Sequence, residues 1–228
     1  MSTPSSIAII GGSGDLGSGL AKRWAAAGHR VILGSRSAEK AAAAAAELGA
    51  AVGKTLEGTD NRAAAAAADL VVVAVPFSSH AETLADIRAV VEGKIVVDAV
   101  VPLKPPKVAT VQLPDEGSAA QIAQALLGAG TRVVSAFHNV GASKLHAGEP
   151  VGCDVLVFGD DKEAREVVIA LVADIGARGI DGGALANSAA AEALTSVLIG
   201  INRRYKVQGA GIRITGLPEI GAGEGGVA

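Results

Sequence analysis

The sequence predicts an α/β fold: a Rossmann-type, doubly wound and mostly parallel sheet joined to a small C-terminal α/β domain. Short runs rich in Val and Ile alternate with helical patterns up to about residue 150, and this alternation is typical of a doubly wound sheet. The runs are almost continuously apolar, as expected for parallel strands buried on both faces. A glycine-rich turn at residues 11–17 follows the first run directly.

The apolar runs give the expected strands, and the stretches between them give the expected helices. We expect strands at residues 6–10, 30–34, 70–75, 94–99, 131–137 and 153–158. We expect helices at residues 15–27, 38–48, 61–68, 79–92 and 117–128, the last one capped by Ser118. Beyond residue 150 we expect a helix at 161–175, an extended piece at 177–181 and a long helix from about 185 to 205.

A G-x-G-x-x-G motif joins the first strand to the first helix, with its glycines at Gly12, Gly14 and Gly17. Gly12 permits a tight turn, Gly14 lets the backbone approach a pyrophosphate, and Gly17 lets the helix pack close to the strand. The pyrophosphate would lie at the helix N-terminus, where free N–H groups and the helix dipole favour an anion. The motif therefore predicts a dinucleotide site.

The end of the second strand predicts which dinucleotide is bound. An NAD enzyme carries Asp or Glu there to bind the ribose 2′-hydroxyl, whereas this chain has Ser35 and Arg36, with Lys40 one helical turn further. A hydroxyl, a guanidinium and an ammonium attract a 2′-phosphate that a carboxylate would repel. We expect NADP; the alternative is that Arg36 and Lys40 are an ordinary solvated start of a helix.

Two further features bear on function. His138 follows an apolar strand, so it is expected at a strand's carboxyl end, where ligands bind in such sheets. It either positions a cofactor ring or is a structural histidine, whereas His80 is expected at the surface. The last helix carries an apolar stripe that includes Leu198 and needs a partner. We expect a homodimer through this helix.

Composition excludes several classes of function. The 228 residues are 50% hydrophobic and carry a net charge of -3, so we expect no nucleic-acid partner. No apolar run approaches the roughly 18 residues of a membrane span, and the first residues lack a basic signal-peptide region. Cys153 is the single cysteine, and the four histidines lack metal-ligand spacing. We expect a cytoplasmic protein without a metal site.

Several segments together resemble one known family, the F420-dependent NADP reductases. The resemblance covers about residues 6 to 216, and its most specific parts are Ala136-Phe137-His138-Asn139 and Asn202-Arg203-Arg204-Tyr205-Lys206. The other matching segments are Gly11–Gly17, Gly34–Arg36, Val75–Phe77, Lys94–Asp98 and Asn187-Ser188. The resemblance implies reversible transfer of a hydride between the deazaflavin coenzyme F420 and NADP, directly from ring to ring.

The resemblance also implies the cofactor contacts. The residues expected at the pyrophosphate are Ser13, Gly14, Asp15 and Leu16. Those expected at the 2′-phosphate are Ser35, Arg36 and Lys40, and those expected beside NADP are Phe77 and Ala142. The space where the two rings meet is expected to be lined by Val101, His138, Val140 and Ala210. Neighbouring positions included in the expected site are Pro76, Pro102 and Asn139.

This chain departs from the family pattern at two of these places. Phe77 stands where many members have Trp, and Val140-Gly141 stands where some have an Ile-Pro pair. Both changes keep an apolar wall but alter its shape. Hydride transfer between two cofactors needs facing rings and excluded water rather than a general acid, so His138 is expected to position a ring without being an obligatory acid.

The expected organisation has three parts. Residues 1–150 form the NADP-binding Rossmann domain, residues 151–220 a small domain that completes the F420 pocket and the dimer contact, and residues 221–228 a flexible tail. Two other functions stay open for this sequence. One is an NADP-dependent imine or carbonyl reductase, in which His138 would be the proton donor. The other is a redox sensor that binds NADP without turnover.

Overall fold

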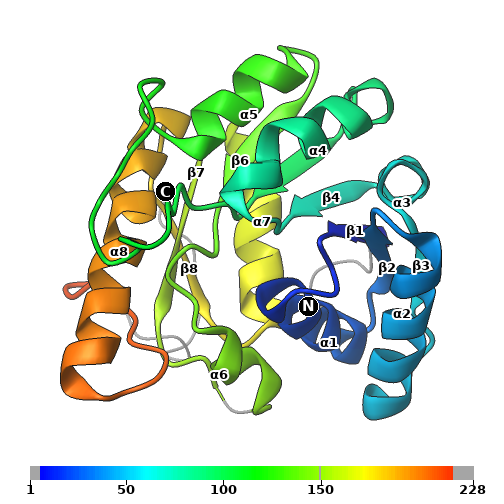
Figure 1. Ribbon diagram of the computed structural model, residues 1–228, viewed down its shortest axis with the longest axis horizontal. Coiled ribbons are helices and arrows are strands. Elements are labelled where there is room, and N and C mark those ends of the chain that lie inside the picture. Colours follow the sequence, from blue (N-terminus) through cyan, green and yellow to red (C-terminus); the bar gives the residue numbers. More distant parts are fainter. Residues whose placement is uncertain (1–5, 149, 218–228) are drawn as a thin grey trace.

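Eight strands hydrogen-bond in the order β3-β2-β1-β4-β5-β6-β7-β8. The computed structural model describes residues 6–148 and 150–217, and Figure 1 shows their arrangement. The strands are β1 (Ser6–Ile10), β2 (Arg30–Ser35), β3 (Glu57–Asp60), β4 (Leu70–Val73), β5 (Ile95–Asp98), β6 (Arg132–Ser135), β7 (Asp154–Gly159) and β8 (Arg178–Asp181). Only the pair β6 and β7 is antiparallel among the described strands. The predicted Rossmann-type, mostly parallel sheet is confirmed.

Helices cover both faces of the sheet. The α-helices are α1 (Asp15–Ala27), α2 (Ala38–Val52), α3 (Asn61–Ala67), α4 (His80–Ile87), α5 (Ala119–Leu127), α6 (Ala142–His146), α7 (Lys162–Asp174) and α8 (Ser188–Tyr205). The short 3-10 turns are η1 (Phe77–Ser79), η2 (Arg88–Val90) and η3 (Leu185–Asn187). Ser118 caps α5 as predicted, because its hydroxyl accepts a hydrogen bond of 3.0 Å from the Gln121 N–H.

Two apolar clusters, one on each face, hold these layers together. Ile7 and Ile9 of β1 face the cluster that includes Leu20 and Trp24 of α1. Ala8 and Ile10 face the opposite cluster, which contains residues of α3, α4 and α5. Alternate residues of one strand thus enter opposite clusters. The sheet is buried on both sides, which explains why its strands read as continuous apolar runs.

The structure corrects some element boundaries. The predicted helix at 79–92 is divided into α4 and η2, and the predicted strands at 70–75 and 131–137 end at Val73 and Ser135. Strand β3 and helix α6 were not predicted. β3 reads Glu-Gly-Thr-Asp, without an apolar run, because it lies at the edge of the sheet and is only partly buried. α6 spans 5 residues, too few for a periodic pattern to register.

The C-terminal part adds to the same sheet. β7 pairs with β6, and β8 pairs with β7, so residues from 151 onward extend the N-terminal sheet. A functional division near residue 150 stays a prediction, and the predicted tail at 221–228 lies outside the described residues. Within the described part of the chain, no helix is long and apolar enough to cross a membrane.

Candidate functional site

The glycine turn after β1 is built by close backbone approach. Gly11 carries the positive φ of the turn, 84°, so Gly11 and not Gly12 supplies the left-handed backbone. A Cβ on Gly12 would lie 2.8 Å from Leu33 Cδ2, and one on Gly17 would lie 2.6 Å from the Gly11 carbonyl oxygen. Both positions therefore exclude a side chain. Gly14 is exposed and directly precedes α1, which leaves the helix N-terminus open on this side.

A cavity of about 390 Å³ lies against this turn, at the carboxyl ends of β1, β2 and β4. It brings together several residues that the sequence predicted separately: Ser13, Gly14, Ser35, Arg36 and Pro76. Its remaining lining residues are Gly11, Asn61, Ala74, Val75, Ser79, Glu82, Thr83 and Asp86. The cavity sits where the strand order reverses between β1 and β4, which is the usual place for a nucleotide in a doubly wound sheet.

Four other predicted residues do not line this cavity. Asp15 is exposed as the first residue of α1, and Leu16 packs partly buried against the core. Lys40 is exposed on α2, one turn beyond Arg36. Phe77 is half-buried, with its ring centroid 6.1 Å from that of His80.

Val101 and Pro102 follow β5 and line neither this cavity nor the next one described. Pro102 is buried and Val101 half-buried, so the structure gives Pro102 a packing position.

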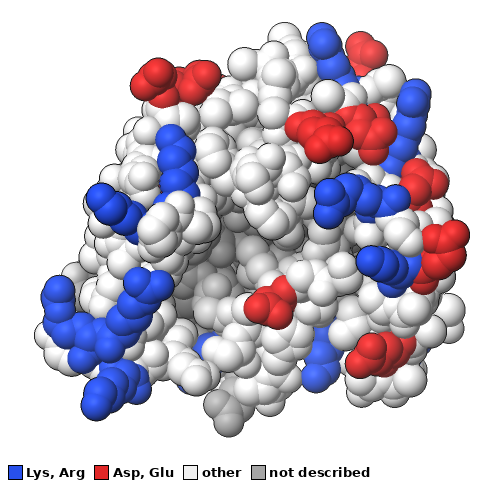
Figure 2. Space-filling view, in the orientation of Figure 1, with Lys and Arg blue, Asp and Glu red and all other residues white. Residues whose placement is uncertain are grey.

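A second cavity, of about 360 Å³, gathers the other predicted residues. It lies between the chain that follows β6 and the long helix α8, and Figure 2 shows the surface hollowed beside α8. The predicted residues that line it are His138, Asn139, Val140, Ala142 and Ala210. α8 contributes Thr195, Leu198, Ile199 and Asn202 to the opposite wall. Residues more than fifty positions apart in the chain thus form one pocket with mixed apolar and polar walls.

A strained turn places His138 in this pocket. Phe137 is buried with a φ of 71°, a conformation that a bulky residue rarely adopts, and it packs edge-on against Trp24 at 5.7 Å. The turn brings the His138 carbonyl oxygen 2.8 Å from the Thr195 hydroxyl, which donates to it from α8. The core therefore fixes the backbone that presents the histidine.

The His138 imidazole is neutral near physiological pH. Burial lowers the pKa of His138 to about 4, although the nearby Asp98 carboxylate acts in the opposite direction. Its Nε2 lies 3.3 Å from the Ser135 hydroxyl oxygen. Its Nδ1 is buried and has no hydrogen-bond partner among the described residues. A buried ring nitrogen without such a partner is unusual, since buried polar atoms are normally paired.

Two amides secure the walls of the same pocket. The Asn139 Nδ2 donates to the Asp154 carbonyl oxygen at 2.6 Å, and the Ala210 N–H donates to Asn202 Oδ1 at 2.9 Å. Gly141 faces Gly209 so closely that a Cβ on Gly141 would lie 2.6 Å from the Gly209 Cα. The Asn139 side chain therefore hydrogen-bonds the first residue of β7 and is not free to bind a ligand through its Nδ2.

Sequence reasoning missed a group of buried titratable residues beneath the site. His80 was expected at the surface, but it is 1% exposed and its Nε2 lies 2.7 Å from Asp98 Oδ2. Glu192 of α8 is equally buried and accepts hydrogen bonds from the Ala119 and Ala120 N–H groups at 2.7 and 3.1 Å. A single Glu in a helical stripe gives no signal of such a contact. Glu192 connects α8 to the start of α5.

Glu192 predicts a pH dependence of folding stability. Burial raises the pKa of Glu192 from 4.5 to about 7, and the negative charge of Asp98 acts in the same direction. The two N–H donors and His80 lower the pKa, but their effects are smaller than that of burial. Because the folded-state pKa is the higher one, this contribution to stability is fully present below pH 4.5 and is lost as the pH rises through 7.

We expect the melting temperature of Glu192→Gln, which cannot ionise, to lack the corresponding decline between these pH values. Thermal unfolding of both proteins across this range is the measurement. Parallel curves for the two proteins would contradict the assignment.

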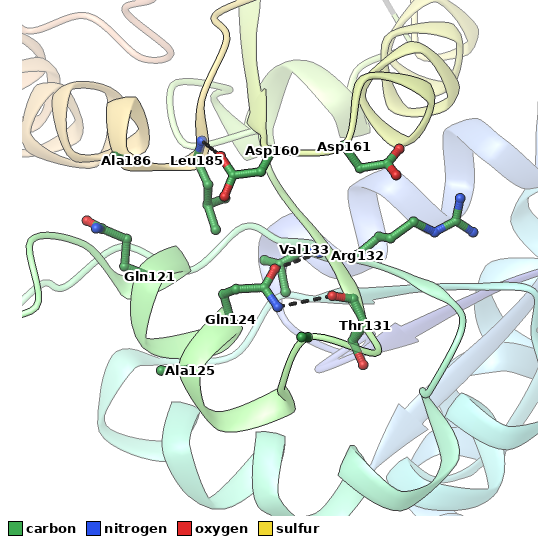
Figure 3. Close-up of a pocket in the computed structure, with 11 residues that line it drawn as sticks. Gln121, Gln124, Ala125, Thr131, Arg132, Val133, Asp160, Asp161, Leu185 and Ala186 are labelled. Carbon is green, nitrogen blue, oxygen red and sulfur yellow. Dashed lines mark hydrogen bonds between the residues drawn. The ribbon is translucent and has the colours of Figure 1, made fainter.

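A larger cavity, of about 700 Å³, lies beside the start of β6, at the amino end of the parallel strands (Figure 3). It is lined by polar residues that include Gln124, Arg132 and Asp160 and by none of the predicted site residues. Gln124 is occupied in joining α5 to β6, because its Nε2 donates to the Thr131 carbonyl oxygen at 3.0 Å. The predicted residues therefore collect at the carboxyl edge and not in this cavity.

Comparison with known proteins identifies the family. A family profile described as "NADP oxidoreductase coenzyme F420-dependent" matches residues 6–102. The F420-dependent NADP reductase of Methanothermobacter thermautotrophicus is 45% identical over an alignment of 222 residues that covers 93% of this chain and 96% of that protein. The chain belongs to the F420-dependent NADP reductase family. The reductase of that name from Methanocaldococcus jannaschii is 41% identical, over 92% of this chain and 98% of that protein.

Solved structures share the fold of this family member. The hypothetical protein SMa0349 from Sinorhizobium meliloti has a TM-score of 0.67 at 26% identity, over 82% of this chain and 88% of that one. The reductive aminase from Aspergillus terreus, solved in complex with NADPH and ethyl-5-oxohexanoate, has a TM-score of 0.61 at 20% identity, over 90% of this chain and 63% of that one. The second likeness is one of fold alone.

Proposed function

We propose that this chain is an oxidoreductase that transfers a hydride, reversibly and directly, between the deazaflavin coenzyme F420 and NADP. The observation that carries the proposal is the pair of cavities at the carboxyl edge of the sheet. One holds the glycine turn with Ser35 and Arg36, and the other holds His138 with Val140 and α8. Transfer from ring to ring requires a site for each cofactor, and both cavities open where the parallel strands end.

The first cavity fits NADP. The glycine turn packs closely against neighbouring backbone, since a Cβ on Gly11 or Gly17 would lie 2.5 or 2.6 Å from a backbone oxygen, and Gly11 and Gly14 line the cavity. Ser35 and the exposed Arg36 lie at the end of β2, where the chain has no Asp or Glu. These groups would hold the 2′-phosphate, while the open N-terminus of α1 would face the pyrophosphate.

The second cavity fits the deazaflavin ring. Its walls combine apolar side chains, Val140 and Leu198 among them, with the polar side chains of His138 and Thr195. When both cofactors are bound, their rings supply the hydride chemistry. His138, which is neutral near pH 7 because its pKa is about 4, would position a ring by hydrogen bonding, and the walls would exclude water.

The roles of the two parts of the chain follow from these cavities. We assign NADP binding to residues 1–150, which supply every lining residue of the first cavity. We assign completion of the F420 pocket to residues 151–220, because Thr195, Leu198 and the stretch 207–210 form one wall of the second. A cytoplasmic location also stays a prediction.

An absorbance titration separates this function from its alternatives. Purified protein mixed with NADPH and F420 at slightly acidic pH should bleach the visible band of F420. An imine or carbonyl reductase would oxidise NADPH only with its own substrate and leave F420 unchanged. A redox sensor would bind NADPH and oxidise none of it.

We also propose a homodimer through α8. Leu198, the residue first expected at the contact, is 6% exposed in the single chain and lines the second cavity, so substituting it cannot report on association. Val197 is 46% exposed on the same helix, and Tyr205 and Val207 at the end of the helix are also exposed.

We expect Val197→Asp to convert the dimer to monomer, because a carboxylate buried in an apolar contact is costly. Light scattering measures the mass of both proteins. Val167→Asp is a matched control, since Val167 is comparably exposed at 44% but lies on α7. A monomer from the unmodified chain would rule the dimer out.

A further inference from the structure

Asn61 is a buried polar residue whose side-chain oxygen has no partner in the described part of the chain. Its side chain is 6% exposed, and its Oδ1 has no hydrogen-bond partner among the described residues. Burying an amide oxygen without a donor destabilises the folded chain, so such atoms are rare and call for an explanation. Asn61 also lines the cavity that holds Ser35 and Arg36. A ligand in that cavity is the natural partner for the amide.

The sheet places Asn61 beside Arg36. β3 runs parallel to β2, with Asp60 in register with Ser35, so Asn61 and Arg36 are the next residues to leave the same edge of the sheet. Asp60 fixes the turn that follows, because its carboxylate accepts a hydrogen bond of 2.8 Å from the Ala63 N–H. The position of Asn61 is thus set by strand pairing and by a helix cap.

Gly34 leaves the space that the Asn61 amide occupies. A Cβ on Gly34 would lie 3.2 Å from Asn61 Oδ1 and 2.7 Å from Ile10 Cδ1. The amide therefore lies directly against the last part of β2, next to the residues expected at the 2′-phosphate. Across the cavity, α4 presents the carboxylates of Glu82 and Asp86. A phosphate would be repelled from that wall toward Arg36 and Asn61.

We propose that Asn61 is a specificity-determining residue for NADP, whose side-chain amide binds the 2′-phosphorylated ribose alongside Arg36. The amide has both edges that this group needs, since Nδ2 donates to a phosphate oxygen and Oδ1 accepts from a ribose hydroxyl. This inference rests on the proposed use of NADP. It adds a neutral residue, the first of α3, to a site otherwise predicted from the end of β2.

The test compares binding of NADP⁺ and NAD⁺, which differ only in the 2′-phosphate, by calorimetry. Asn61→Ala should weaken NADP⁺ binding about tenfold or more and weaken NAD⁺ binding clearly less, because NAD⁺ loses only the ribose-hydroxyl contact and not the phosphate contact. Asn61→Asp has nearly the same shape but a charge that repels phosphate, so it should weaken NADP⁺ binding further. Asn187→Ala is a matched control, because that amide bonds the Gly182 carbonyl oxygen on another part of the sheet.

The outcomes separate this proposal from the function on which it rests. If the unmodified protein fails to bind NADP⁺, the proposed function is wrong. If it binds NADP⁺ and the Asn61 variants bind it equally well, or lose both nucleotides equally, the role of Asn61 is wrong. Should neither variant fold, the assigned side-chain amide signal of Asn61 in the unmodified protein serves instead. It should shift more with NADP⁺ than with NAD⁺, and an equal response to both would overturn the proposal.

Discussion

Replacing Arg36 by Ala should raise the KM for NADPH about ten- to a hundredfold, because a hydrogen bond to a charged group is worth about 1.5–3 kcal/mol. The side chain is exposed at the end of β2 and lines the cavity beside the glycine turn. Use of NADH should change little, since NADH lacks the phosphate that Arg36 would bind. Steady-state kinetics with both nucleotides is the measurement.

Arg88→Ala provides the control for the Arg36 variant. Arg88 is also exposed but lies on η2, away from the residues that line the cavity. Its loss should leave both KM values unchanged. A preference of the unmodified enzyme for NADH would contradict the assignment of Ser35 and Arg36 to the 2′-phosphate.

Replacing His138 by Ala should slow turnover by roughly one to two powers of ten, or about 1.4–2.8 kcal/mol, while NADPH binding stays nearly intact. The histidine is neutral because burial lowers its pKa to about 4, so above that pH it holds no proton to donate as imidazolium. Its loss would disturb ring placement without removing an acid. Single-turnover kinetics, with nucleotide binding measured separately, checks both halves of this expectation.

A loss of four or more powers of ten in His138→Ala would give a different answer. It would mark His138 as an essential acid and favour reduction of a carbonyl or imine. The pH profile adds an independent check, because a positioning role predicts no ionisation of His138 between pH 5 and 8. His138→Gln, which keeps a hydrogen-bonding side chain, should recover part of the lost rate.

The parts of the site that the sequence predicts are those encoded locally. The glycine turn and the end of β2 lie within one short βαβ segment, and their spacing alone indicates a nucleotide and its phosphate. His138 could be placed because a strand's end is visible as the end of an apolar run. Residue type and distance along the chain were sufficient in each case.

The residues that sequence reasoning missed act through contacts between distant segments. Asn61 reaches the site only because β3 pairs with β2, and β3 itself carries no apolar pattern. His80 meets Asp98 across two elements, and Glu192 reaches the start of α5 from a helix over seventy residues later. Leu198 followed the correct helical stripe but faces inward. Periodicity identifies a face, whereas packing decides which neighbour covers it.

Isotope transfer tests the central claim most directly. NADPH carrying deuterium at the transferable position of the nicotinamide should be mixed with F420 and this enzyme in ordinary water, and the reduced deazaflavin analysed by mass spectrometry. Direct ring-to-ring transfer predicts that the deuterium of one face of the nicotinamide appears on carbon in the product without dilution by solvent hydrogen. Reduced F420 that carries only solvent hydrogen, whichever face of the nicotinamide is labelled, or F420 that is not reduced at all, would contradict the account.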